Sequence, residues 1–129
     1  MKDFRDLKVW ARAHQITLAI YRATREFPRE ETYGMVSQLR RCSASVAANI
    51  AEGCGRVGNP EFGRFLGMAM GSASELEYFL LLSRDLDFIS KAKYESMARN
   101  VCEMRRMLNG LMAKVQAERC NSLRVKVHS

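Results

Sequence analysis

The stretch that decides the fold is residues 45–56, SVAANIAEGCGR. Its Ala, Val and Ile residues continue an apolar helical pattern, and the glycines that follow predict the end of that helix. Asn49 and Glu52 interrupt the apolar pattern with polar side chains, which cost free energy when they are buried without partners. Two interpretations compete: a catalytic or metal-binding carboxylate, and a polar cluster that fixes how helices pack.

Apolar residues at alternating spacings of three and four extend this helical pattern over most of the chain. They predict four helices, over roughly residues 3–27, 30–54, 59–86 and 90–119. No segment shows a sustained period of two with hairpin turns, so we expect no sheet. Four helices with short connections predict an all-α, antiparallel up-and-down four-helix bundle. We expect one domain over residues 1–119 and a basic flexible tail over residues 120–129.

Local signals predict where the helices begin and which faces they bury. Asp3 is the expected N-cap of the first helix, and Asn59 followed by Pro60 is the expected start of the third. Pro28 ends the first helix because proline disfavours helical geometry in the residue before it. The seam expected to be buried in the first helix consists of Phe4, Leu7, Ala11, His14, Leu18 and Tyr21.

The composition is that of an ordinary globular domain. The chain has 129 residues, of which 47% are hydrophobic and 27% are charged. No apolar run approaches the roughly 20 residues that a membrane helix needs. The first ten residues contain acids and no apolar signal region, so we expect a cytoplasmic protein without a membrane partner.

Six polar residues fall on neighbouring helical faces of the second and third helices. They are Gln38, Ser45, Asn49, Glu52, Ser72 and Glu75. Antiparallel packing could bring the two groups together, with Arg41 beside the first group as a partner for a buried carboxylate. The interpretation we favour is a structural polar network that organises the bundle core or an edge between subunits.

The competing enzymatic interpretation needs ligands that the pattern does not supply. Carboxylate-bridged metal sites in helical bundles use Glu-x-x-His motifs, and neither His14 nor His128 follows a glutamate by three. The four cysteines lack metal-binding spacing, and Gly53-x-Gly55-x-x-Gly58 leaves a helix rather than a strand. We therefore expect no enzyme activity, catalytic residue, cofactor, metal or small-molecule substrate, and we expect His14 in the core.

The formal charge of +7 is concentrated in the first and last segments of the chain. Residues 1–29 carry a net charge of +4 and residues 91–129 carry +6, whereas residues 60–90 carry −3. This distribution favours a polyanionic partner. The expected phosphate-contacting residues are Arg40, Arg41, Arg105, Arg106 and Lys114. The alternative is a protein-interaction scaffold that uses the long apolar third helix.

A set of motifs in this order resembles one known family. The motifs are FRDLKVW at 4–10, FP at 27–28, YGMVSQLRR at 33–41, SVAANIAEG at 45–53 and EFGRFLGMAMGSASELE at 61–77, followed by a Met- and Leu-rich last helix. The chain resembles the small helical proteins named after the intervening sequences of bacterial 23S ribosomal RNA genes. That name refers to gene location and not to a demonstrated RNA ligand.

The resemblance implies a left-handed four-helix bundle and a homo-oligomer, because members and relatives assemble as rings of five with a basic central channel. The family is similar to the accessory protein of diversity-generating retroelements, which binds a reverse transcriptase and nucleic acid. No enzyme activity is attached to the family, and its cellular role is unsettled. In this context NIAEG is a packing and helix-ending signature, with Gly53 expected as a permissive residue where the helix stops.

Overall fold

The computed structural model describes the backbone of residues 3–128 and the side chains of residues 3–121. All regular structure in the described part is helical, which confirms the predicted all-α class. The long helices are α1 (Lys8–Thr24), α2 (Met35–Cys54), α3 (Asn59–Asp85) and α4 (Lys91–His128). Two short 3-10 turns, η1 (Phe4–Asp6) and η2 (Arg29–Glu31), precede α1 and α2.

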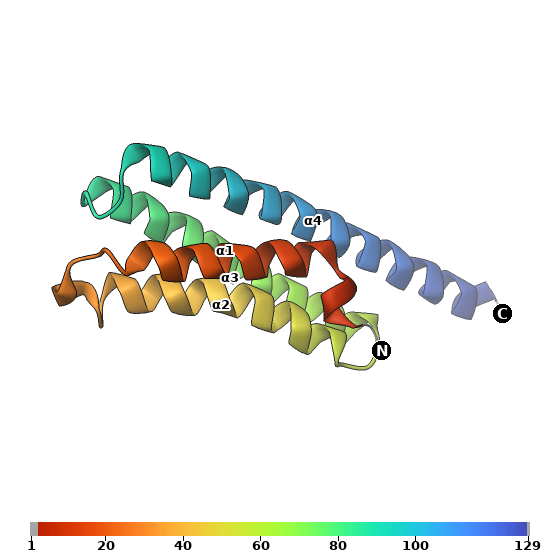
Figure 1. Cartoon of the computed structure of the whole chain (residues 1–129). Coiled ribbons are helices and arrows are strands. Elements are labelled where there is room, and N and C mark those ends of the chain that lie inside the picture. Colours follow the sequence, from red (N-terminus) through yellow and green to blue (C-terminus); the bar gives the residue numbers. More distant parts are fainter. Residues whose placement is uncertain (1–2, 129) are drawn as a thin grey trace.

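The helices pack in the order in which they follow one another along the chain (Figure 1). α1 contacts α2, α2 contacts α3, α3 contacts α4, and α4 returns to contact α1. Because the connections are short, each helix is antiparallel to the next. The predicted up-and-down four-helix bundle is therefore confirmed.

The interior is a single apolar core to which all four helices contribute. Its fully buried side chains include Ile20 from α1, Leu39 and Ile50 from α2, Leu76 from α3 and Leu108 from α4. Burial of this apolar surface is the main favourable contribution to the free energy of folding.

The buried face predicted for the first helix is wrong. The core side of α1 consists of Val9, Ala13, Ile16 and Ile20, whereas His14 and Tyr21 of the expected seam are exposed. Apolar residues occur at helical spacing on both sides of this helix, so periodicity alone does not select the buried one. The β-branched residues occupy the buried side, and the expected seam mixes polar and aromatic side chains.

The chain before α1 also differs from the prediction. Asp3 caps the η1 turn, where its Oδ1 accepts a hydrogen bond from the Arg5 backbone N–H at 3.0 Å. Leu7 is extended, and α1 begins only at Lys8. The capping residue was therefore identified correctly, but the element that it caps is a separate turn.

The SVAANIAEG stretch ends α2 in a way that differs from the expectation for Gly53. The helix continues through Cys54, and Gly55 follows as its cap with an ordinary φ of −84°. A Cβ atom added at Gly53 would lie 2.9 Å from Phe65 Cβ and 3.0 Å from Phe62 Cδ1. Gly53 is therefore required for the close approach of α2 to α3, and not for ending the helix.

The turn that follows depends on another glycine. Gly58 has a φ of +85° and is the N-cap residue of α3, so Asn59 is the first helical residue and not the cap. A φ in this region is readily adopted by glycine and costs free energy for most other residues. Pro60 lies in the first turn, where its missing N–H is not needed.

α4 is longer than the bundle requires. Val115 is still buried, and the Asn59 side chain lies 3.4 Å from a Glu118 carboxylate oxygen, so the start of α3 meets α4 near this point. The helix continues to His128 and extends past the ends of its neighbours in Figure 1. The side chains of residues 122–129 lie outside the described part, and the flexible tail over residues 120–129 stays a prediction. Among the described residues, no helix is long and apolar enough to span a membrane.

Candidate nucleic-acid interface

Three of the six residues expected in a polar network lie together between α2 and α3. Asn49 Nδ2 donates to the Ser45 backbone carbonyl at 2.9 Å and to Ser45 Oγ at 3.1 Å. Ser72 Oγ donates to Ser45 Oγ at 3.0 Å, which is the hydrogen bond that crosses between the helices. All three residues are half-buried. The group is a small polar contact at the edge of the core.

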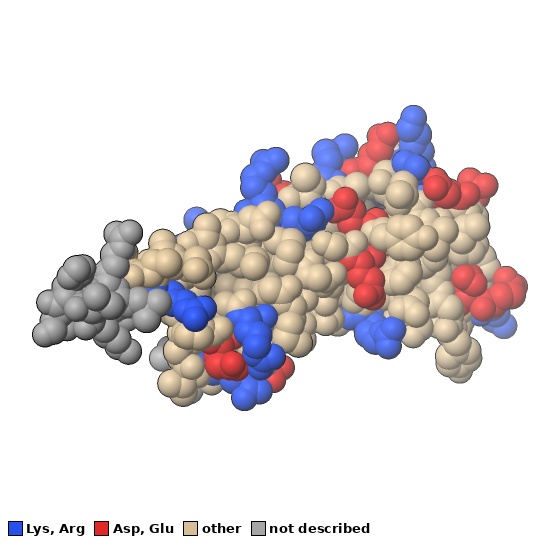
Figure 2. All heavy atoms as spheres, turned by 180° about the vertical axis from the view of Figure 1, so that it is seen from behind, with Lys and Arg blue, Asp and Glu red and all other residues tan. Residues whose placement is uncertain are grey.

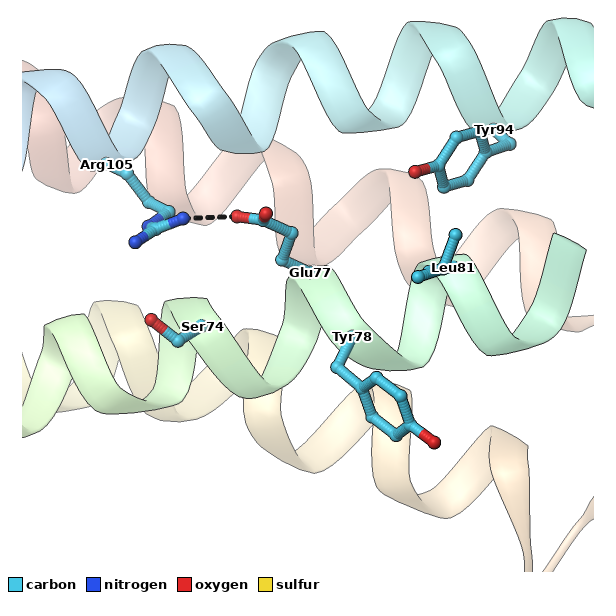
Figure 3. A pocket seen from close by; sticks show the side chains of 6 residues that line it. All are labelled: Ser74, Glu77, Tyr78, Leu81, Tyr94 and Arg105. Carbon is cyan, nitrogen blue, oxygen red and sulfur yellow. Dashed lines mark hydrogen bonds and ion pairs between the residues drawn. The ribbon is translucent and has the colours of Figure 1, made fainter.

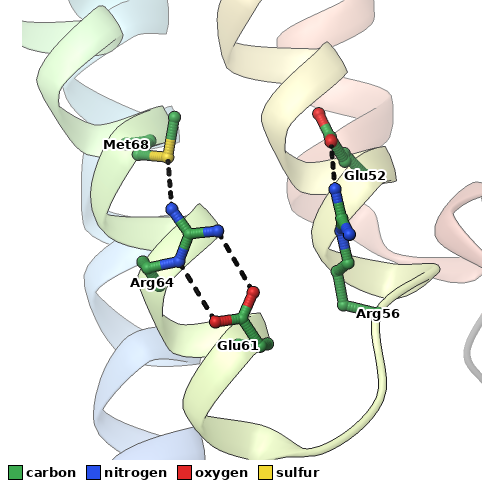
Figure 4. A network of polar contacts seen from close by, with 5 residues as sticks. All are labelled: Glu52, Arg56, Glu61, Arg64 and Met68. Carbon is green, nitrogen blue, oxygen red and sulfur yellow. Dashed lines mark hydrogen bonds and ion pairs between the residues drawn. The ribbon is translucent and has the colours of Figure 1, made fainter.

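The other three residues lie apart from this group. Glu52 is exposed, and its Oε1 accepts a hydrogen bond from Arg56 Nη2 at 2.8 Å (Figure 4). Gln38 accepts a hydrogen bond from Arg41 Nη2 at 2.9 Å, and Glu75 is exposed. The expected buried carboxylate is therefore wrong, because the end of α2 turns Glu52 toward solvent and provides an arginine one turn later.

A second ion pair lies beside that of Glu52 at the same end of the bundle. Arg64 donates to both carboxylate oxygens of Glu61, at 3.2 and 3.1 Å, and the two pairs lie on either side of the α2–α3 turn in Figure 4. The hydrogen bonds from Arg64 lower the pKa of Glu61 below its ordinary value, and they raise the pKa of Arg64. The side chains are exposed, so the pairing is a surface feature of small stabilising effect.

The chemistry that these groups offer is limited. Within the described part of the chain, no three His, Cys, Asp or Glu side chains are grouped as a metal site would require. Burial raises the pKa of the Cys42 thiol to about 12, with a smaller contribution from the negative charge of Glu75. A thiol in this state is not a nucleophile near neutral pH. Cys54 is also buried, whereas Cys102 and Cys120 are exposed.

A groove of about 350 Å³ lies between α3 and α4 (Figure 3). Its lining residues are Ser74, Glu77, Tyr78, Leu81, Tyr94 and Arg105. Arg105 Nη1 forms a close ion pair with Glu77 Oε2 across the groove. Arg105 is thus one of the expected phosphate-contacting residues whose charge is balanced within the chain.

Three more of the expected phosphate-contacting residues are also engaged. Arg40 Nε donates to Thr24 Oγ1 at 2.9 Å, its Nη2 donates to the Tyr21 carbonyl at 3.3 Å, and its guanidinium lies 4.6 Å from the Tyr21 ring centroid. Arg106 pairs with Glu103 at 3.2 Å, and Arg41 bonds to Gln38. Lys114 is exposed and, among the described residues, has no ion-pair partner.

Most other cations without ion-pair partners among the described residues lie on α1 and α4, which are neighbours in the bundle. Arg25 and Arg29, which lie between α1 and α2, are the exceptions. α1 carries three cations and no carboxylate. This signal is present in the sequence of residues 8–24, but the phosphate-contacting residues were predicted from adjacent arginines instead. We call the set on these two helices the basic side. Its members are Lys8, Arg12, Arg22, Lys91, Lys93, Arg99, Lys114 and Arg119.

The back of the molecule carries charges of both signs. Figure 2 views the molecule from behind, with α3 toward the viewer, and shows acidic and basic residues in small mixed groups around a broad uncharged area. On the exposed surface of α3, Gly67 and Gly71 face open space, and Met68 and Tyr78 are 46% and 56% exposed. We call this part of α3 the α3 face; it also carries the exposed Glu75, and it is where another protein surface could approach closely.

One edge of α1 carries aromatic rings, among them His14, which we expected in the core. The His14 ring stacks on the Trp10 ring with centroids 5.1 Å apart and planes 8° apart. The centroids of the Phe4 and Trp10 rings lie 4.8 Å apart. The Arg5 guanidinium lies 4.8 Å from the Phe4 centroid. His14 itself is exposed, so the expected core histidine is wrong.

The fold and the charge distribution define an up-and-down helical bundle in which α1 and α4 carry cations without ion-pair partners among the described residues. The family model of the 23S rRNA-intervening sequence protein matches residues 5–110, and the chain belongs to this family. The resemblance found in the sequence is thereby confirmed. A comparison with curated proteins finds no match.

A solved structure supports the same fold. A crystal structure of a protein with unknown function from the S23 ribosomal protein family of Bacteroides thetaiotaomicron VPI-5482 has a TM-score of 0.73 to this chain. The two sequences are 24% identical, and the match covers 81% of this chain and 97% of that chain. At this identity the similarity concerns the fold alone.

Proposed function

We propose that the protein is a non-enzymatic helical bundle that assembles with copies of itself and binds the backbone of nucleic acid, alone or within a nucleoprotein. The observation that carries the proposal is the basic side, and above all α1, whose three cations have no carboxylate on the same helix. Cations without intramolecular partners are available to replace the counterions of a polyanion. The family resemblance supports the same class of partner.

The residues that contact phosphate on this proposal differ in part from those expected from the sequence. Lys114 stays in the set, and Lys8 and Arg12, one turn apart on α1, lie toward the same end of the bundle because α1 and α4 are antiparallel (Figure 1). Arg40, Arg41, Arg105 and Arg106 would have to give up their present partners before contacting phosphate. Contacts of this kind position nucleic acid without reading its sequence.

Assembly would repeat the basic side several times in one particle. The α3 face offers exposed apolar side chains and open glycines for a neighbouring copy. The ring of five is the number that the family resemblance gives. In a closed ring each subunit uses two different surfaces, so the α3 face of one copy would meet another surface of the next. Repeated weak phosphate contacts then act together on one nucleic acid strand.

Light scattering tests both parts of the proposal. The absolute mass of the purified protein is measured with and without a structured RNA at two salt concentrations. We expect a particle of several times 14.7 kDa that gains RNA mass at low salt and loses it at high salt. A monomer would contradict the assembly, and failure to bind RNA at low salt would contradict the nucleic-acid part.

The second candidate function is a protein-interaction scaffold without a nucleic-acid role. It is favoured by Met68 and Tyr78, which expose large apolar side chains on α3 beside Gly67 and Gly71. On this alternative, replacing Met68 and Tyr78 by serine abolishes binding of the protein partner. Replacing Lys8, Arg12 and Lys114 by glutamine leaves that binding unchanged. The nucleic-acid proposal predicts instead that the glutamine variant loses affinity for RNA.

A further inference from the structure

The cations of α1 all lie on the flank of the helix that faces α4. Tyr21 directly follows a buried residue, and the Arg40 guanidinium of α2 lies 4.6 Å from its ring centroid, so that flank of α1 faces α2. Lys8, Arg12 and Arg22 instead directly precede buried residues, which places them on the other side of the buried face. Because α1 packs against both α2 and α4, this other flank borders α4.

α4 presents a matching flank to α1. Arg105 directly follows a buried residue and pairs with Glu77 of α3, which marks the flank of α4 that faces α3. Asn100 and Lys114 directly precede buried residues and therefore lie on the opposite flank, toward α1. Lys93 also lies near α1, because it lines a small pocket together with the last turn of that helix.

We call the two facing flanks the α1–α4 surface. Its members are the cations Lys8, Arg12, Arg22, Lys93 and Lys114 and the amides Gln15 and Asn100. Because the two helices are antiparallel, the cations form two groups, with Lys8, Arg12 and Lys114 toward one end and Arg22 and Lys93 toward the other. The two amides lie between these groups, and both are exposed.

The charge of this surface is positive at its ends and nearly neutral in its middle. None of its five cations forms an ion pair among the described residues. Two carboxylates border it. Glu103 is paired with Arg106 at 3.2 Å, so its charge is balanced, and Glu26 lies beyond the last residue of α1, beside Lys93.

The spacing of the cations suits two rows of phosphates better than one. Arg12 and Arg22 are ten residues apart, which is about 15 Å along the helix axis, and Lys8 and Arg22 are about 21 Å apart. Between two rows of phosphates, double-stranded RNA presents a wide and shallow minor groove with its 2′-hydroxyls. The amides of Gln15 and Asn100 can donate to and accept from such hydroxyls.

We propose that the α1–α4 surface lies across the minor groove of double-stranded RNA. The two cationic groups contact the phosphates on either side, and Gln15 and Asn100 contact the 2′-hydroxyls between them. This inference rests on the proposed nucleic-acid function and adds to it the form of the partner. DNA lacks the 2′-hydroxyl and has a narrower minor groove, so duplex RNA is bound more tightly than duplex DNA of the same sequence.

The experiment compares two duplexes that differ only in the sugar. The full-length protein is titrated into a fluorescently labelled RNA duplex of about 20 base pairs, which is longer than the roughly 16 that a double-stranded-RNA domain spans. The DNA duplex of the same sequence is titrated in parallel. Anisotropy of the label measures affinity at several salt concentrations.

We expect the wild type to bind the RNA duplex at least about fivefold more tightly than the DNA duplex. The double variant Gln15→Ala/Asn100→Ala should lose about threefold or more in RNA affinity through its lost hydrogen bonds. Its affinity for DNA and its salt dependence should stay those of the wild type, because no charge is removed.

The matched control is Asn109→Ala. Asn109 is also exposed on α4, but it lies nine residues beyond Asn100, which is about two and a half turns and places it on the other side of the helix. This variant should keep the wild-type preference for RNA. All the substitutions alter exposed side chains, and circular dichroism checks that each variant is folded.

The outcomes separate this inference from the proposed function. If RNA and DNA duplexes bind equally with a steep salt dependence, or if DNA binds more tightly, the minor-groove contact is overturned and the nucleic-acid proposal stands. A double variant that prefers RNA as strongly as the wild type also overturns it. If neither duplex nor single strands bind at low salt, the proposed function fails and the inference fails with it.

Discussion

Two glycine-to-alanine substitutions in helices should change stability in opposite directions. Gly53 lies inside α2, and an added Cβ would meet Phe65 Cβ at 2.9 Å and Phe62 Cδ1 at 3.0 Å. Gly110 lies inside α4, and an added Cβ would have no atom within 4 Å. Because both sites are helical, Ala should gain about 1 kcal/mol of helix propensity at either position.

The difference between the two variants isolates the packing of α2 against α3. Overpacking a core contact typically costs about 1–3 kcal/mol, and Phe65 Cβ cannot move without its backbone. We therefore expect Gly53→Ala to be about 1–3 kcal/mol less stable than Gly110→Ala, a difference of several degrees in melting temperature. Gly110→Ala should be at least as stable as the wild type.

Urea unfolding followed by far-UV circular dichroism measures this difference at one fixed protein concentration, because assembly would make stability depend on concentration. Equal stability of the two variants would refute the interpretation that Gly53 is required for close approach.

Two substitutions, one labelling reaction and one pH dependence test other contacts. Asn49→Leu should remain helical but lose a single oligomeric state in light scattering if the polar contact with Ser45 fixes register, and an unchanged mass would remove that role. Arg40→Ala should lower the free energy of unfolding by about 1–2 kcal/mol through its lost hydrogen bonds while leaving RNA affinity unchanged, whereas lost affinity at unchanged stability would reverse the assignment. At pH 8 a thiol reagent should label the exposed Cys102 and Cys120 in the native protein and spare Cys42 until urea is added. The raised pKa of Cys42 also makes stability depend on pH, because the folded state keeps the thiol protonated up to about pH 12 whereas the unfolded thiol ionises near pH 9.0. The contribution of Cys42 to the free energy of unfolding is therefore complete below pH 9 and is lost as the pH rises toward 12. The midpoint of urea unfolding, measured across this pH range, should fall accordingly.

The number, type and order of the helices could be predicted from the sequence because each has a long apolar period and a clear break after it. Which side of α1 is buried could not, because apolar residues recur on both sides and only packing against the other helices decides between them. The Ser45–Ser72 contact could be predicted from residue spacing, because both residues fall on facing sides of antiparallel neighbours. The exposure of Glu52 could not be predicted in this way, since it depends on how the last turn of α2 ends.

The candidate phosphate-contacting residues could also be predicted only in part. Adjacent arginines such as Arg40 and Arg41 are conspicuous in the sequence, but their partners come from side chains and carbonyls that only the fold brings near. The absence of carboxylates between Lys8 and Thr24 is visible in the sequence and marks the helix with unpaired cations. Counting both signs of charge on each helix is therefore more informative than finding clusters of one sign.

The most direct test of the basic side is the salt dependence of RNA binding for two triple variants of equal charge. One variant replaces Lys8, Arg12 and Lys114 by glutamine. The matched control replaces Arg56, Arg64 and Arg84, each of which already has a carboxylate partner.

The account predicts that the slope of log affinity against log salt becomes shallower by about 2 or more in the first variant. The control variant should bind with nearly the wild-type slope. Equal slopes for the wild type and the first variant, or a larger loss in the control, would contradict the claim that α1 and α4 form the nucleic-acid interface.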